Sequence, residues 1–247
     1  MNNPNPKKKP IPLPVFLIFA VVLLGGSLVM NSIKKSAADP VPETSETEVT
    51  TDVESVNDTP EQLPWIDEAG DADQAIVVTS SASTAEVSMY EKSSDGSWNM
   101  LLETNGYVGE EGVGKASEDR TATPEGVYSI PFAFGILPDP GCSIEYTEVD
   151  DSYYWVDDPN SKYYNKFVST DDVECDWESA EHITAVGYPY NYVLPFDYNS
   201  DCIPGSGSAF FLHCTQDKPT QGCVTIPESD MIKILQAIRD NCVIIIH

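Results

Sequence analysis

The chain reads Ser208-Ala-Phe-Phe-Leu-His-Cys214 and, after a short polar loop, Thr220-Gln-Gly-Cys-Val224. The first stretch predicts a β-strand, because aromatic and aliphatic side chains favour a pleated surface. Side chains on a strand alternate between its two faces. One face therefore carries Ala209, Phe211 and His213, and the other carries Phe210, Leu212 and Cys214. The polar turn before Val224 can return Cys223 to the side of His213.

The surrounding sequence continues this β pattern. Short runs of β-branched and aromatic residues, separated by turn residues, predict further strands at 75–79, 85–90, 98–102, 126–130 and 243–246. Pro227 begins a predicted helix over residues 227–240, whose apolar face carries Met231, Ile234, Leu235 and Ile238. Residues 138–197 are acidic and rich in tyrosine, and we expect long surface loops there with one or two strands. The predicted class is mainly β with one C-terminal helix.

The N-terminal region predicts a membrane anchor. Residues 11–30 carry no charge and, at about 1.5 Å per residue, just span a hydrocarbon layer of about 30 Å. Three lysines at positions 7–9 favour a cytoplasmic tail over residues 1–10. The small residues at 36–38 leave open a cleaved signal peptide. We therefore expect either a single-pass protein of the cell membrane with an extracytoplasmic domain, or a protein secreted after cleavage.

The charge distribution separates a spacer from a folded domain. Residues 36–73 contain twelve acidic and no basic side chains, so we expect residues 31–73 to form a disordered spacer. Subtracting those twelve acids from 40 and the five N-terminal lysines from 13 basic residues leaves 28 acidic and 8 basic residues. The predicted domain at 74–247 thus has a net charge of −20, which argues against nucleic acid as a partner.

The expected proximity of Cys223 and His213 predicts nucleophilic chemistry. A free thiol has a pKa of about 8.5, so a cysteine nucleophile needs a neighbouring base, and His213 is suitably placed. The carbonyl of Cys214 is a candidate for orienting the imidazole. We expect the backbone amides around Gly222 and Cys223 to face the oxygen that becomes negatively charged during acyl transfer.

These residues also resemble a known family. Phe-Leu-His213 with Thr-Gln-Gly-Cys223-Val is similar to the motif of the L,D-transpeptidase catalytic domain family (YkuD-type). Two upstream stretches, Tyr107-Val-Gly-Glu-Glu-Gly-Val-Gly-Lys115 and Thr123-Pro-Glu-Gly-Val-Tyr128, resemble the family's glycine-rich hairpin and Thr-Pro strand. The resemblance covers residues 75–247 and implies a β-sandwich-like fold and an exported enzyme that acts on peptidoglycan stem peptides.

The resemblance also implies a reaction that needs no metal or organic cofactor. The thiolate attacks an L,D peptide bond, expels a terminal D-amino acid and forms a thioester. An amine then makes a cross-link, whereas water would make the protein an L,D-carboxypeptidase. Thr220, Gln221 and Tyr190 are candidate substrate-binding residues. Two positions depart from the family pattern: Gln221 replaces a histidine, and Thr225 replaces an arginine or asparagine.

Other interpretations compete with this one. Six cysteines in an exported chain suggest disulfides, with Cys142 and Cys175 as the first pair to expect. A disulfide at Cys223 would indicate a non-catalytic cell-wall-binding module. A zinc site is disfavoured because His213 and Cys214 point apart. The glycines of residues 109–115 fit a hairpin turn better than a phosphate-binding loop, because two carboxylates would lie in the cradle.

Overall fold

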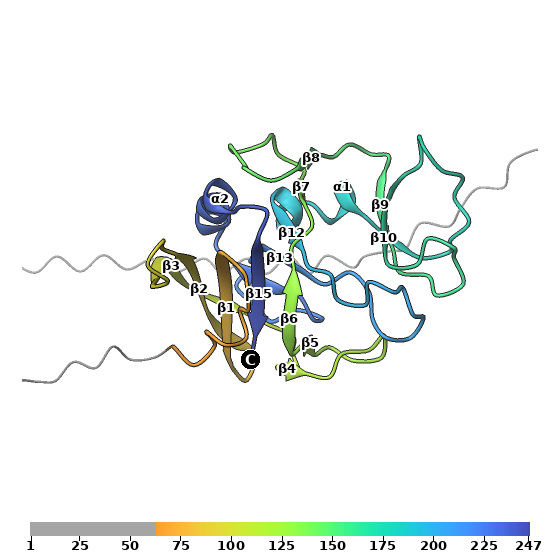
Figure 1. Ribbon diagram of the computed structural model, residues 1–247. Helices are drawn as coiled ribbons and strands as arrows, with labels where there is room; N and C mark the ends of the chain where they lie inside the picture. Colours follow the sequence, from red (N-terminus) through yellow and green to blue (C-terminus); the bar gives the residue numbers. More distant parts are fainter. Residues whose placement is uncertain (1–62) are drawn as a thin grey trace, which may run out of the picture. The chain divides into compact units, whose positions relative to one another are not determined.

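The computed structural model describes residues 63–247 (Figure 1). The expected cytoplasmic tail at 1–10, the transmembrane helix at 11–30 and the spacer up to residue 62 lie outside the described residues. Between residues 63 and 247, the chain has no helix that is long and apolar enough to cross a membrane. Strands greatly outnumber helices in this part of the chain, so the predicted mainly β class is confirmed.

A sheet of ten strands dominates the domain. In spatial order its strands are β6 (Gly126–Ser129), β15 (Cys242–Ile246), β1 (Gln74–Ser81), β2 (Thr84–Lys92), β3 (Trp98–Tyr107), β14 (Val224–Ile226), β13 (Phe211–Cys214), β12 (Val193–Pro195), β7 (Ala133–Gly135) and β8 (Tyr146–Glu148). The pairs β1–β15, β13–β14 and β7–β8 are parallel. The sheet is therefore mixed, and it contains the strands predicted at 75–79, 85–90, 98–102, 126–130, 208–214 and 243–246.

This sheet curls until its two ends approach each other. The backbone N–H of Ser129, in the edge strand β6, donates to Asp197 Oδ1 at 2.8 Å. Asp197 lies just after β12, near the other end of the sheet. Tyr128 of β6 stacks on Phe196 with ring centroids 5.4 Å apart. The sandwich-like arrangement expected from the family resemblance is thus produced by one curled sheet whose halves face each other.

The largest core cluster fills the inside of the curl. On β13 it includes Leu212 and Cys214, whereas Phe211 belongs to a second cluster on the opposite face. The alternation predicted for residues 208–214 is therefore confirmed. The strand is shorter than expected because Ala209 has a φ of 58°, which is incompatible with an extended chain, so that regular pairing begins at Phe211.

The C-terminal helix α2 (Glu228–Ala237) closes the core with its predicted apolar face. Met231, Ile234 and Leu235 are fully buried. The helix is shorter than the predicted range of 227–240. Gln74 accounts for its end, because its side chain donates to Ala237 O and accepts from the backbone N–H of Arg239. Those two hydrogen bonds satisfy backbone groups at the helix terminus, where the chain turns toward β15.

Residues 138–197 contain more regular structure than the sequence indicated. They form a three-stranded sheet of β10 (Lys166–Ser169), β9 (Tyr153–Val156) and β11 (Ala180–His182), joined by long loops, which Figure 1 shows beyond β7 and β8. Two short helices follow, α1 (Ile183–Val186) and the 3-10 helix η1 (Tyr188–Asn191). The aromatic side chains of this region pack on the outer face of β13, with Trp155 and Phe211 centroids 4.7 Å apart.

The glycine-rich segment does not form the expected hairpin. Its short strand β4 (Val113–Gly114) pairs in parallel with β5 (Thr123–Pro124), and Gly109 forms an isolated parallel bridge with Thr220. Position 109 requires a residue without a side chain, because a Cβ there would lie 2.0 Å from Thr121 O. The segment is a closely packed loop, and its glycine allows contact between backbones.

Candidate active site

Strand pairing brings Cys223 to the side of His213. β13 and β14 are parallel, with Leu212 opposite Val224 and His213 opposite Thr225. Cys223 therefore precedes β14 on the face that carries Phe211 and His213, and it packs against the cluster containing Phe211. Both side chains line one cavity of about 420 Å³. The predicted pair thus shares a single site.

The imidazole of His213 is held in one orientation. Its Nδ1 lies 3.0 Å from the Cys214 carbonyl, and because a carbonyl can only accept, Nδ1 carries the proton. Burial lowers the pKa of His213 to about 4, although the carbonyls of Cys214 and Pro189 oppose this by favouring the protonated ring. At neutral pH the ring is therefore uncharged, with Nε2 able to accept a proton.

The Cys223 thiol is also uncharged at rest. It donates to Ala209 O at 3.4 Å, a carbonyl positioned by the positive φ of Ala209. Burial raises the pKa of the thiol well above its usual range, the Glu181 carboxylate raises it further, and the Phe211 backbone opposes the shift. With a neutral thiol and a neutral imidazole, any nucleophilic attack by Cys223 would require proton transfer at the same time.

A tight turn fixes the backbone on either side of Cys223. Thr220 Oγ1 donates to Cys223 O at 2.6 Å and accepts from the Gly222 N–H at 3.1 Å. Of the two amides expected to face an oxyanion, that of Gly222 is therefore used inside the turn, and the Cys223 amide is the remaining candidate. Gly222 has a φ of 143°, and a Cβ there would lie 2.5 Å from the Phe210 ring.

The glycine-rich loop supports this turn from one side. The backbone N–H of Glu110 donates to Thr220 O at 2.9 Å, and the Thr220 N–H donates to Val108 O at 3.0 Å. The close approach at Gly109 allows these contacts. The glycines that superficially resemble a phosphate-binding loop thus hold the cysteine turn in place.

Comparison with known proteins identifies the family of this chain. The family model of the L,D-transpeptidase catalytic domain (YkuD) matches residues 75–246. The chain belongs to this family. Among solved structures, it is similar to a cysteine-to-serine variant of Enterococcus faecium L,D-transpeptidase, with 16% identity and a TM-score of 0.34. That match covers 71% of this chain and 50% of the other chain, so the chain spans half the length of that relative. A search of curated proteins finds no match.

In this L,D-transpeptidase domain, Glu181 is a site residue that the sequence did not reveal. It lies on β11 and lines the same cavity as Cys223 and His213. The hydroxyl of Tyr190 donates to Glu181 Oε2 in a short hydrogen bond. Burial raises the pKa of Glu181 to about 7, the Tyr190 hydrogen bond opposes the shift, and Asp157 adds to it. A lone acid in an aperiodic stretch gave no sequence signal for this position.

Tyr190 connects Glu181 to the imidazole. Its ring is buried and lies edge-on to His213, with centroids 5.3 Å apart. Burial and the Glu181 charge raise the pKa of Tyr190 well above its usual range, so it remains a hydrogen-bond donor. Tyr190 was predicted as a substrate-binding residue, and it also lines the larger cavity.

Two cavities of the L,D-transpeptidase domain meet at Cys223. The larger one contains Thr220 and the imidazole, and the smaller one, of about 160 Å³, reaches toward Ser117, Glu118, Arg120, Asp157 and Ser208. Three residues, Glu181, Gln221 and Cys223, line both. Of the candidate substrate-binding residues, exposed Gln221 is thus the one at the junction.

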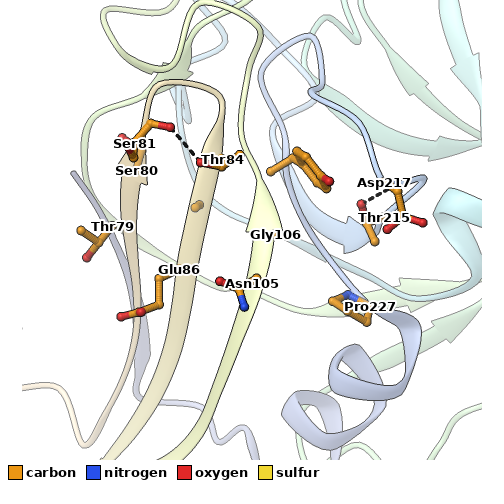
Figure 2. Close-up of a pocket in the computed structure, with 12 residues that line it drawn as sticks. Thr79, Ser80, Ser81, Thr84, Glu86, Asn105, Gly106, Thr215, Asp217 and Pro227 are labelled. Atoms are coloured by element: carbon orange, nitrogen blue, oxygen red, sulfur yellow. Dashed lines mark hydrogen bonds between the residues drawn. The ribbon is translucent and has the colours of Figure 1, made fainter.

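A still larger groove, of about 660 Å³, is not lined by Cys223 (Figure 2). Figure 2 shows polar side chains of β1 and β2 on one side and Thr215, Asp217 and Pro227 on the other. The loop after β13 separates this groove from the cavity of His213, because Thr215 and Asp217 line the groove while Gln216 and Lys218 line the cavity. The largest of these three cavities is therefore not the one that contains Cys223 and His213.

All six cysteines of the domain are free thiols. The expected Cys142–Cys175 disulfide is thus wrong for this structure, and Cys223 is not part of a bridge. Cys214 packs in the core with no exposed surface, on the face opposite to His213. Within residues 63–247, no three His, Cys, Asp or Glu side chains are arranged to hold a metal ion.

Proposed function

We propose that this protein is a peptidoglycan L,D-transpeptidase in which Cys223 is the nucleophile and His213 its base. The observation that carries the proposal is a free Cys223 thiol beside a neutral imidazole whose Nδ1–H is fixed on the Cys214 carbonyl. Such an arrangement leaves Nε2 free to take the thiol proton.

The first half of the reaction forms a thioester. As the sulfur attacks the carbonyl carbon of an L,D stem-peptide bond, its proton passes to His213 Nε2. The Cys223 amide then stabilises the resulting oxyanion. The C–N bond then breaks, the leaving D-amino acid takes the proton from His213, and the acyl group remains on the sulfur.

The second half releases the acyl group to an amine on another stem peptide, which makes a cross-link. Gln221 lies where both cavities meet, so we propose that it contacts the substrate peptides. Thr220 acts indirectly, because its hydroxyl is used to hold the turn at Cys223. We further propose that residues 11–30 anchor the domain in the cell membrane, on the extracytoplasmic side.

Intact-mass spectrometry of the full chain mixed with a stem tetrapeptide tests the proposal. We expect a mass increase equal to the peptide minus its terminal D-amino acid, and no increase in a Cys223→Ala chain. Adding a stem tripeptide with a free amine should convert the adduct into a cross-linked product. Release by water alone would indicate the L,D-carboxypeptidase. Failure of the unaltered chain to form any adduct would leave the non-catalytic wall-binding module.

A further inference from the structure

The Glu181 carboxylate has no use in forming the thioester. A negative charge beside a thiol disfavours the thiolate, so Glu181 opposes activation of Cys223. Nevertheless, Glu181 lines both cavities at the nucleophile, and Tyr190 fixes its orientation. A carboxylate in this position is therefore better suited to a later step, in which a positively charged group reaches the site.

The smaller cavity is suited to a positive charge. Its one basic side chain, Arg120, is paired with Glu111 at 2.8 Å, and Glu118 accepts a hydrogen bond from the Tyr164 hydroxyl. Asp157 also lines this cavity, and its buried Oδ1 has no hydrogen-bond partner among the described residues. An unsatisfied buried carboxylate oxygen is costly, and a ligand with several N–H donors would relieve that cost.

We propose that Asp157 and Glu181 bind the primary ammonium group of the acceptor, and that Glu181 removes a proton from it so that the amine can attack the thioester on Cys223. This inference rests on the proposed function and assigns its acceptor site. It places the acceptor amine in the smaller cavity and leaves the larger cavity, with His213, for the donor peptide.

The proton and electron changes balance with groups already in the site. The ammonium loses one proton to Glu181, and its nitrogen lone pair attacks the thioester carbonyl carbon. His213 Nε2 takes the second proton as the C–N bond forms. The C–S bond then breaks, and the departing sulfur recovers that proton from His213. Glu181 finally releases its proton to water.

The surroundings of Glu181 fit this role. A general base is most effective when its pKa lies near the working pH, and burial brings the pKa of Glu181 into that range. The other charged and titratable groups of the smaller cavity are Asp157, Glu118, Arg120 and Cys223, and the larger cavity adds Tyr190, His213, Glu110 and Lys218. Once an ammonium is bound, its charge offsets that of the carboxylate.

Decay of the thioester tests the proposal. The full chain is first acylated with stem tetrapeptide, and loss of the adduct is then followed by rapid quench and mass spectrometry at several acceptor concentrations. One acceptor is a stem tripeptide whose side-chain amine is protonated at neutral pH, and the other is hydroxylamine, which is largely uncharged. In Glu181→Gln we expect the second-order rate constant for the tripeptide to fall at least about 100-fold.

For hydroxylamine we expect a change of less than about threefold, because a neutral nucleophile needs neither the cation site nor the base. Glu86→Gln, in the separate groove that does not contain Cys223, should leave both rate constants unchanged, and Asp157→Asn should raise the tripeptide concentration needed for half-maximal transfer. Equal losses for both acceptors in Glu181→Gln, or no loss for the tripeptide, would overturn the inference. If the unaltered chain forms no thioester, the proposed function itself fails.

Discussion

The charge state of His213 distinguishes this site from one with a preformed thiolate–imidazolium pair. Burial lowers the pKa of His213 to about 4, so the ring can act as a base throughout the mildly acidic range. In a Glu181→Gln chain, where the neighbouring acid no longer titrates, we expect the rate of Cys223 acylation to show no inflection near pH 6.5. The measurement is the pH dependence of adduct formation with stem tetrapeptide. An inflection at the ordinary histidine pKa would contradict the buried, neutral ring.

Glu181 should make stability depend on pH. Its pKa in the folded chain, about 7, is higher than the ordinary value of 4.5, so folding favours the protonated acid. The stabilisation is fully present below the unfolded pKa and is lost as the pH rises through about 7. Glutamine is neutral at every pH and can still accept the Tyr190 hydrogen bond. Urea unfolding should therefore show that Glu181→Gln increases the unfolding free energy at alkaline pH relative to the unaltered chain, with a smaller effect in acid; Glu110→Gln is the control.

Gly222 should tolerate no side chain. A Cβ would lie 2.5 Å from Phe210 Cε1, and the φ of 143° is unfavourable for any other residue. We expect Gly222→Ala to lower the unfolding free energy by about 1–3 kcal/mol, as overpacking commonly does, and to displace the Cys223 turn. Denaturant unfolding and adduct formation measure the two effects. Gly205→Ala is the matched control, because Gly205 also has a positive φ but has no atom within 4 Å of its Cβ position.

At the residue scale, the sequence could predict that Cys223 and His213 lie in one site, because their placement depends on local patterns. The alternation along residues 208–214 placed His213 on one face, and the turn at Gly222 returned Cys223 to it. Glu181 depends instead on burial by segments distant in the chain, and no local pattern encodes that. The same holds for the Gly222 amide, whose hydrogen bond to Thr220 depends on the conformation of the turn.

Among the elements, α2 is the one most clearly encoded in the sequence. Its apolar residues recur at helical spacing, and the structure buries them under the curled sheet. Leu235 has no exposed surface, so we expect Leu235→Ala to lower the unfolding free energy by about 2–5 kcal/mol. Lys233→Ala is the control, because Lys233 is exposed and its ion pair with Asp230 contributes little at the surface. Equal effects in denaturant unfolding would contradict the assigned face.

The elements between residues 138 and 197 were harder to predict for a physical reason. Strands β9, β10 and β11 are short, and Trp155 is the only one of their Trp, Tyr and Phe residues that is buried. Their pairing joins segments separated by loops, which neither alternation nor turn residues reveal. The helix end at Ala237 has a similar origin, since the side chain that satisfies it, Gln74, comes from β1.

For the molecule as a whole, the folded part begins earlier than the boundary at residue 74. Residues 63–73 form turns that pack on the outer face of the sheet. Trp65 is only 4% exposed, with its ring centroid 4.7 Å from that of Tyr90 and 5.2 Å from that of Trp98. The acidic composition of this region predicted disorder, although its acidic residues and its buried Trp65 occupy different positions of the same short segment.

Trp65 should therefore stabilise the domain without taking part in its chemistry. Its cluster contains Ala75, Val77 and Ile245, whose side chains point away from the main core. We expect Trp65→Ala in the full chain to lower the unfolding free energy by about 3–5 kcal/mol, the usual cost of removing a buried aromatic side chain, while Cys223 is still acylated under native conditions. The measurements are denaturant unfolding and the mass of the peptide adduct. Trp177→Ala is the matched control, because Trp177 lies in a loop and is only partly buried. If both substitutions had equally small effects, residues 63–73 would belong to the spacer, as their composition first indicated.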